Sequence, residues 1–88
     1  KNRSEFLATV LFAEAVSPER VPDLIEDRIR EHKLKLTSME DLLNGNMTPG
    51  ATFVVKYGIA MQRAALDYLK TNKDNIGIVF DDIQEKSA

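Results

Sequence analysis

The sequence contains no cysteine and a single histidine, His32. Disulfide bonds and thiolate metal sites are therefore excluded, and so is a metal site built from several histidines. Positive charge is not in excess either, because 12 Lys and Arg stand against 14 Asp and Glu and the formal net charge is −2. We therefore expect no metal, no cofactor and no nucleic-acid binding through a basic surface of this chain.

Long hydrophobic runs are also missing. The most apolar stretch, residues 6–16, is interrupted by Glu14, and it is much shorter than the roughly 20 residues that a membrane-spanning helix needs. Its flanks do not have the features of a secretory signal peptide. We expect a protein that has no contact with the membrane and works in the cytoplasm.

With 88 residues the chain forms one domain at most. A monomer of this size buries only about 60–65% of the surface that its unfolded chain would expose. Small domains often add disulfides, a metal or a partner subunit to such a thin core. Since the first two are excluded, the sequence favours oligomerisation.

Proline and glycine are few, and they divide the chain into three helical segments, 4–16, 18–43 and 49–72, and a tail, 73–88. Ser17-Pro18 and Thr48-Pro49 are typical of helix starts, with the hydroxyl residue as the cap and proline in the first turn. Pro22 predicts an irregular first turn in the second segment. The tail is open to three interpretations: a short helix, an extended arm or a partly disordered segment.

The first segment is apolar nearly all round, which predicts burial on several sides. The second carries a coiled-coil-like seam with 3-4 spacing, which consists of Pro22, Ile25, Ile29, His32, Leu36, Met39 and Leu43. The unbroken seam favours one helix over a split at 37–40, where a capping box is also present. The third segment has one 3-4 stripe, formed by Val54, Tyr57, Met61, Ala64 and Tyr68, and further apolar residues on other faces. Gly58 predicts the close approach of another helix.

These patterns predict an all-α fold: a three-helix domain, residues 1–72, with a long central helix that pairs as a homodimeric helical bundle. The predicted dimer interface comprises Phe6, Val10, Phe12, Ile25, Ile29, His32, Leu36, Met39, Tyr57, Met61 and Tyr68.

No arrangement of residues predicts an enzyme. His32 lies in the seam of a charged helix, where a polar packing role is favoured over a pH-sensitive role at the dimer interface. Neighbouring carboxylates such as Asp81 and Asp82 are typical of solvated helix faces. For Tyr57 and Tyr68 we favour interface packing with the hydroxyl at the rim. The alternative is a small-molecule site between the first and third helices, lined by Phe12, Tyr57, Met61 and Tyr68.

Two stretches, FLATVLFAEAVSPERVPDLIEDRIREHKLKL and VVKYGIAMQRAALDYLK, resemble the C-terminal domain of PadR-like transcriptional regulators. The resemblance covers about residues 4–72 and rests on the apolar first helix, Ser17-Pro18, the long second helix, Gly58 and the end of the third helix. Tyr68 stands where tryptophan is common in that family, and Asp67 where glutamate is common. The aromatic change weakens a ligand-stacking role more than it affects dimerisation.

The resemblance implies a bacterial homodimer whose DNA contacts come from a separate N-terminal winged helix-turn-helix domain, which this chain does not contain. It also implies that a small-molecule effector can be sensed, since some members respond to phenolic acids or hydrophobic drugs. The competing hypothesis is a stand-alone helical adaptor that binds other proteins and has no DNA-binding domain.

Overall fold

The computed structural model describes the backbone of residues 3–87 and the side chains of residues 3–76. The chain forms α1 (Arg3–Val16), the short 3-10 helix η1 (Pro18–Arg20), α2 (Val21–Leu42) and α3 (Pro49–Ser87). Residues 3–87 contain no strand. The predicted all-α fold with three helices is therefore confirmed.

The local start signals act largely as expected. Pro18 opens η1 and Pro22 lies in the first turn of α2, so the predicted irregular turn is present. The Ser17 side chain makes no capping hydrogen bond. Thr48, in contrast, does cap α3, because the Ala51 N–H donates to its Oγ1 at 3.1 Å. Helix α2 runs through residues 37–40 without a break.

The prediction that the third helix ends near residue 72 was wrong, because α3 continues to Ser87. No proline follows Pro49, and a single internal glycine, Gly77, costs a helix only about 1 kcal/mol. Ile76 also packs against the core, which holds the extended part of the helix to the rest of the chain. The side chains of residues 77–87 lie outside the described part.

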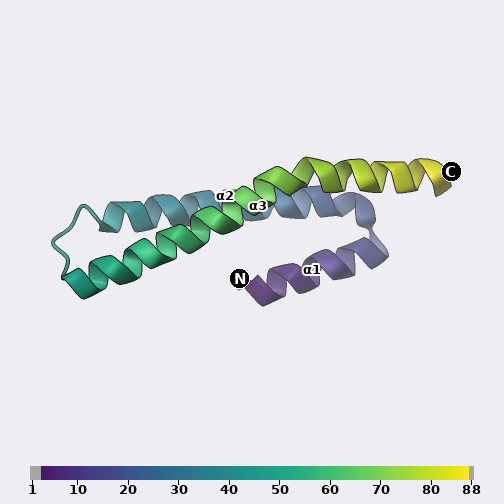
Figure 1. The fold of residues 1–88 in the computed structure, drawn as a ribbon. Coiled ribbons are helices and arrows are strands. Elements are labelled where there is room, and N and C mark those ends of the chain that lie inside the picture. The colour runs from purple at the N-terminus through teal and green to yellow at the C-terminus, as the bar shows by residue number, and fades with distance from the viewer. Residues whose placement is uncertain (1–2, 88) are drawn as a thin grey trace.

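Helices α2 and α3 run antiparallel side by side, and α1 folds back along the first half of α2 (Figure 1). The buried core lies where all three helices meet. It is formed by Ala13, Val21, Ile25 and Ile29, with Phe6, Val10, Leu24, Leu66, Leu69 and Ile76 packed against them. Beyond this cluster, Ile59 is the one fully buried apolar side chain among those described.

The predicted seam of α2 faces inward, and every one of its members is buried or half-buried. Its neighbour is α3 of the same chain, which presents its own 3-4 series: Val55, Ile59, Gln62, Leu66, Leu69, Lys73 and Ile76. A Cβ on Gly58 would lie 3.3 Å from Met39 Cε. The predicted close approach of another helix at Gly58 is thus confirmed, and the helix is α2.

The molecule is elongated, with extents of 59 × 20 × 14 Å. Its accessible surface is 6568 Å², whereas a compact monomer of 9.9 kDa exposes about 5,200 Å². Its radius of gyration is 16.6 Å, against about 12 Å for a compact chain of this length. A single copy therefore leaves far more surface in water than a compact monomer does.

Candidate functional site

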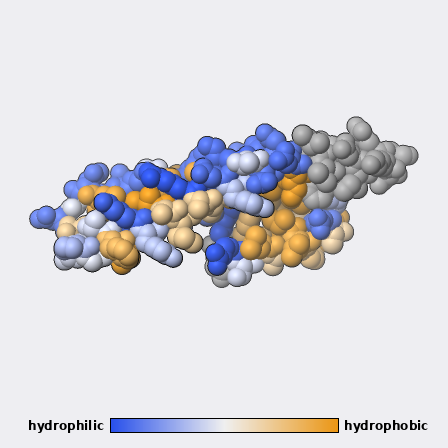
Figure 2. Space-filling model, viewed as in Figure 1, coloured by the Kyte–Doolittle hydropathy of each residue, from blue (hydrophilic) through white to orange (hydrophobic). Residues whose placement is uncertain are grey.

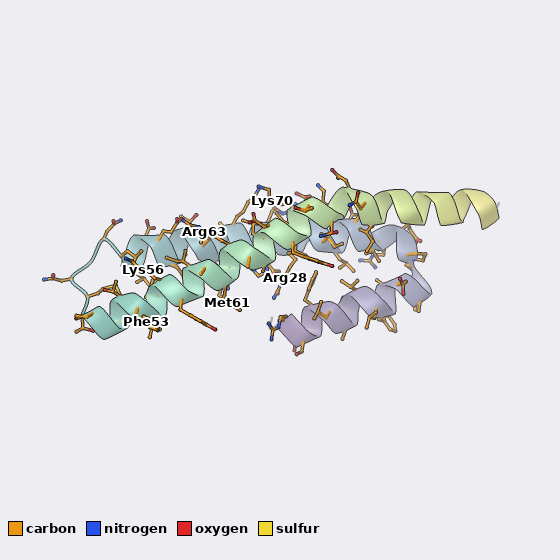
Figure 3. The ribbon with its side chains drawn as sticks, in the orientation of Figure 1. Arg28, Phe53, Lys56, Met61, Arg63 and Lys70 are labelled. Atoms are coloured by element: carbon orange, nitrogen blue, oxygen red, sulfur yellow. The ribbon has the colours of Figure 1, made fainter. Side chains whose placement is uncertain are left out.

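A row of large apolar side chains on α3 points away from α2. This row, which we call the α3 strip, consists of Phe53, Val54, Tyr57, Met61 and Tyr68, all of them exposed. Phe53 is 72% exposed and lies on the part of α3 that α1 does not reach (Figure 3). The stripe predicted from sequence is therefore the face of α3 that this chain leaves uncovered.

Helix α1 adds a second uncovered face. Leu11 and Phe12 are 67% and 69% exposed, and Leu7 and Val16 are exposed beside them. The apolar surface in the view of Figure 2 gathers over the part of the molecule that contains α1. Apolar faces of this extent on a small chain are typical of interaction sites.

A groove runs between α1 and α3, with α2 as its floor. Its volume is about 1240 Å³, which exceeds the roughly 300–1,000 Å³ of common small-molecule sites. Phe6, Leu7 and Val10 line it from α1, while Met61, Tyr68 and Ile76 are among the lining residues of α3. We call this feature the α1–α3 groove.

Arg28 is the buried charged residue of the groove, with an exposed fraction of 9%. Its guanidinium lies over the Phe6 ring, 5.0 Å from the centroid, a geometry that attracts a cation to the ring face. Its Nη1 is 3.3 Å from Glu31 Oε2, and the Glu31 side chain is 55% exposed. The groove therefore has a cation fixed in its wall and a loosely held carboxylate beside it.

His32 also lines the groove, and its Nδ1 donates to Gln62 Oε1 on α3. The imidazole is half-buried. This bond between the seams of α2 and α3 gives His32 the polar packing role that the sequence favoured, within one chain. The pH-sensitive role at a dimer interface stays a prediction.

An ion pair lies near the end of the groove that Ile76 lines. Lys73 Nζ lies 2.6 Å from Glu26 Oε2. The hydrogen bond and the charge of Lys73 lower the pKa of Glu26, and the same interaction with Glu26 raises the pKa of Lys73. Both side chains are about one-third exposed, so solvent screens the pair and its structural contribution is small.

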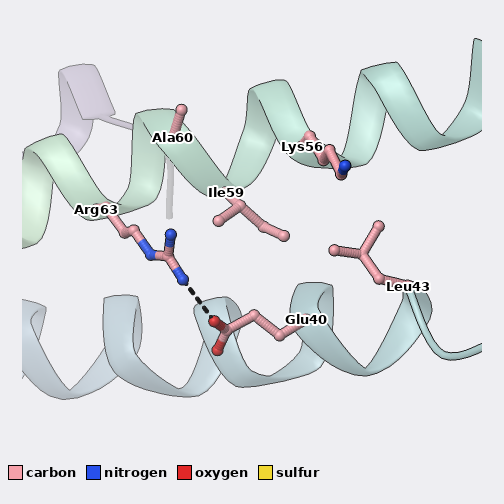
Figure 4. Close-up of a pocket in the computed structure, with 6 residues that line it drawn as sticks. All are labelled: Glu40, Leu43, Lys56, Ile59, Ala60 and Arg63. Atoms are coloured by element: carbon pink, nitrogen blue, oxygen red, sulfur yellow. Dashed lines mark hydrogen bonds and ion pairs between the residues drawn. The ribbon is translucent and has the colours of Figure 1, made fainter.

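A smaller hollow of about 310 Å³ lies between the second half of α2 and the first half of α3 (Figure 4). Arg63 Nη2 and Glu40 Oε2 lie 2.8 Å apart across it. Leu43, Lys56 and Ile59 are among its other lining residues. The ion pair spans the hollow and links α2 to α3 there.

The structure sorts the predicted interface residues into three groups. Phe12, Tyr57, Met61 and Tyr68 are exposed; Phe6, Val10, His32, Leu36 and Met39 are half-buried; Ile25 and Ile29 are buried. The two isoleucines are covered by side chains of their own chain, which gives them an intramolecular role. Contact with a partner stays a prediction, and the exposed group is the one that is free to make it.

The four residues predicted for a small-molecule site do not all come together. Met61 and Tyr68 line the α1–α3 groove, but Phe12 and Tyr57 do not. Phe12 lies on the outer face of α1, and Tyr57 precedes the start of the groove along α3. The sequence prediction also missed Arg28. Its spacing of three residues from Ile25 places it on the inward face, and this signal could have identified it.

Two features are absent from the described residues. No group of three or more His, Asp or Glu side chains among them converges as metal ligands would. Within the same part of the chain, no helix combines the length and the apolar character that crossing a membrane requires.

The fold and its surfaces define an all-helical domain built on a long antiparallel helix pair. Residues 2–75 match the sequence model of the family described as "Virulence activator alpha C-term". The match covers most of the chain, and the chain belongs to this family as the C-terminal domain of a regulator. No curated protein and no solved structure matches the sequence.

Proposed function

We propose that the chain is the dimerisation module of a PadR-like bacterial transcriptional regulator that works in the cytoplasm. Winged-helix domains supplied by another part of the regulator contact DNA. A two-fold symmetric pair of modules sets the distance between these domains, and this spacing suits a pseudo-palindromic operator. The chain itself has no catalytic role in this proposal.

The observation that carries the proposal is the exposed α3 strip. Phe53, Tyr57 and Tyr68 are each more than 60% exposed, although aromatic residues bury 150–250 Å² apiece when they are covered. Aromatic side chains are enriched in the cores of protein–protein interfaces. A second copy that covers the strip removes this surface from water. The excess surface of two copies is about 2,700 Å², which exceeds the roughly 1,600 Å² of a standard interface.

The solution mass tests the proposal. We expect light scattering during size exclusion to give twice the chain mass of 9.9 kDa, and we expect this mass to persist on dilution. A monomeric mass across the dilution series would contradict dimerisation through this module. The stand-alone adaptor is tested separately: a reading frame of the full protein without a winged-helix domain would favour it.

A further inference from the structure

The residues that line the α1–α3 groove carry a net positive charge, whereas the whole chain carries a net negative charge. Among the described residues, Arg3, Arg28, Lys35 and Lys73 line it, and Glu31 is the one carboxylate. The complete chain carries a net charge of −2. Cationic side chains are therefore concentrated at this one groove of an acidic protein.

The position of Arg28 strengthens this point. A charged side chain at 9% exposure loses much of its hydration and is retained only with compensating interactions. Its Nη1–Glu31 distance of 3.3 Å is longer than the 2.7–2.9 Å that is typical of a strong charge-assisted hydrogen bond. The guanidinium is therefore a fixed positive charge in the wall of the groove, next to the Phe6 ring and Glu31.

The rest of the groove is apolar and long. Leu7 and Val10 form one wall, and Leu69 and Ile76 belong to the opposite wall. The lining residues of α3 extend from Met61 to Ile76, which corresponds to about 22 Å of helix. One leaflet of the hydrocarbon core of a bilayer is about 15 Å thick, so an extended acyl chain fits within this length.

We propose that the α1–α3 groove binds a free, single-chain carboxylate amphiphile, with the carboxylate beside Arg28 and Lys35 and the acyl chain between α1 and α3. The aliphatic walls and the excess of cations select this chemistry over a cationic or an uncharged amphiphile. One chain forms the whole groove, so the inference goes beyond the proposed dimer, with Met61 and Tyr68 shared between the groove and the α3 strip. Because the ligand touches α1 and α3 at once, it fixes α1 against the helix pair.

Calorimetric titration of the full chain with dodecanoate, below its micelle concentration, tests the proposal. We expect one dodecanoate per chain and an affinity at least about tenfold higher than for dodecyltrimethylammonium, which has the same chain and the opposite charge. Hexanoate, with its shorter chain, should bind more weakly than dodecanoate because it buries less apolar surface. Absent dodecanoate binding, or equal binding of the cationic detergent, would overturn the proposal.

Variants locate the carboxylate. Arg28→Gln should weaken dodecanoate binding by about tenfold or more, because it removes a charge-assisted contact. Since Arg28 is buried, its replacement can also disturb the fold. Lys35→Gln and Lys33→Gln therefore provide a matched comparison, because both lysines are exposed residues of α2. Lys35 lines the groove and Lys33 does not. We therefore expect Lys35→Gln alone to weaken dodecanoate binding, by about threefold. An equal loss of affinity in both variants would contradict a carboxylate site at this groove.

A final variant separates this site from the dimer. Ala64→Phe places a ring in the groove from an exposed position of the α3 stripe, and it should abolish dodecanoate binding while circular dichroism stays as in the wild type. If the wild type binds no dodecanoate and Ala64→Phe halves its mass, the groove holds a second copy and the proposal is wrong. If the wild type is monomeric and binds dodecanoate, the dimer fails and the groove site stands.

Discussion

The two ends of the helix pair are built differently. At the closed end, α1 packs along the first half of α2, and Ala13, Val21, Ile25 and Ile29 are buried there. At the open end, the second half of α2 and the first half of α3 pack on each other alone, and Ile59 is the buried side chain. A third helix makes the difference between a core and a two-helix contact.

The length of α1 explains why only one end is closed. Its 14 residues span about 21 Å, roughly a third of the 59 Å long axis. Phe53, Val54 and Tyr57 remain exposed at the open end. A second copy related by a two-fold axis presents the same surface in return, as an isologous interface requires. The proposed dimer therefore places association at the open end, whereas the closed end contains the buried core of the chain.

The largest effect on stability is expected from Ile29→Ala. Ile29 is buried among residues of all three helices, so truncation should lower the free energy of unfolding by about 2–4 kcal/mol. Chemical denaturation at fixed protein concentration measures this loss. The control is Leu34→Ala on the same helix, where the side chain is 72% exposed and a change within about 0.5 kcal/mol is expected. Similar losses in both variants would mean that the closed end has no dominant core.

The open end should show the opposite behaviour. Phe53→Gln combined with Tyr57→Gln should raise the dissociation constant of the dimer by about 100-fold, while the helical content stays as in the wild type. Light scattering over a dilution series measures the shift to monomer. Leu34→Gln, an equally exposed apolar residue outside the predicted interface, should leave the mass unchanged. If Leu34→Gln dissociates the dimer and the double variant does not, the interface lies on α2.

A smaller effect is expected at Gly58, where α3 lies close to Met39 of α2. Gly58→Ala gains about 1 kcal/mol of helix propensity, but its Cβ would lie 3.3 Å from Met39 Cε, so Met39 must shift. We expect the gain to be larger by about 0.5 kcal/mol in a Met39→Ala background. Gly50→Ala, which has nothing within 4 Å of the new Cβ, should show no dependence on Met39. Equal effects of Gly58→Ala in both backgrounds would show that the contact with Met39 does not reduce the gain in stability.

Helix positions and inward faces were predictable from the sequence because they depend on local spacing. The series from Ile25 to Leu43 identified the inward face of α2, and Thr48-Pro49 located the start of α3. Spacing does not reveal which helix covers a face, so the α2 seam could be assigned either to α3 of the same chain or to a partner. The end of α3 was missed because the pattern beyond residue 72 does not decide between a helix and an extended arm, whereas the contacts of Ile76 with the core carry the helix onward.

The site was predicted less well than the fold. Tyr68 and Met61 were identified as lining a groove beside α1, but Tyr57 precedes the start of the groove along α3, and Phe12 lies on another side of α1. A difference of one position rotates a side chain by about 100° around a helix, which is enough to move it out of a groove. Arg28 was missed because burial of a charge depends on the partners Phe6 and Glu31, and these contacts exist only in the folded chain.

The smallest effect is expected for the Glu26–Lys73 ion pair, which links α2 to α3 at the closed end. The pKa of Glu26 lies below its ordinary value of 4.5 in the folded chain, so the unfolded chain binds more protons in acid, and the stabilisation is lost as the pH falls through the lowered pKa. The pKa of Lys73 lies above its ordinary 10.5, so its share is lost as the pH rises through the raised pKa. Between pH 4.5 and 10.5 the pair contributes in full.

Glu26→Gln should therefore lower the melting temperature slightly at neutral pH, and the difference from the wild type should vanish at strongly acidic and strongly alkaline pH. Lys73→Gln should reproduce this profile, because removal of either partner breaks the same pair. At 1 M salt the Debye length falls to about 3 Å, so both differences should shrink at neutral pH. A difference that is as large at pH 3 as at pH 7 would show that Glu26 stabilises the closed end by packing, and the link between α2 and the distal part of α3 would then depend on Ile76 instead.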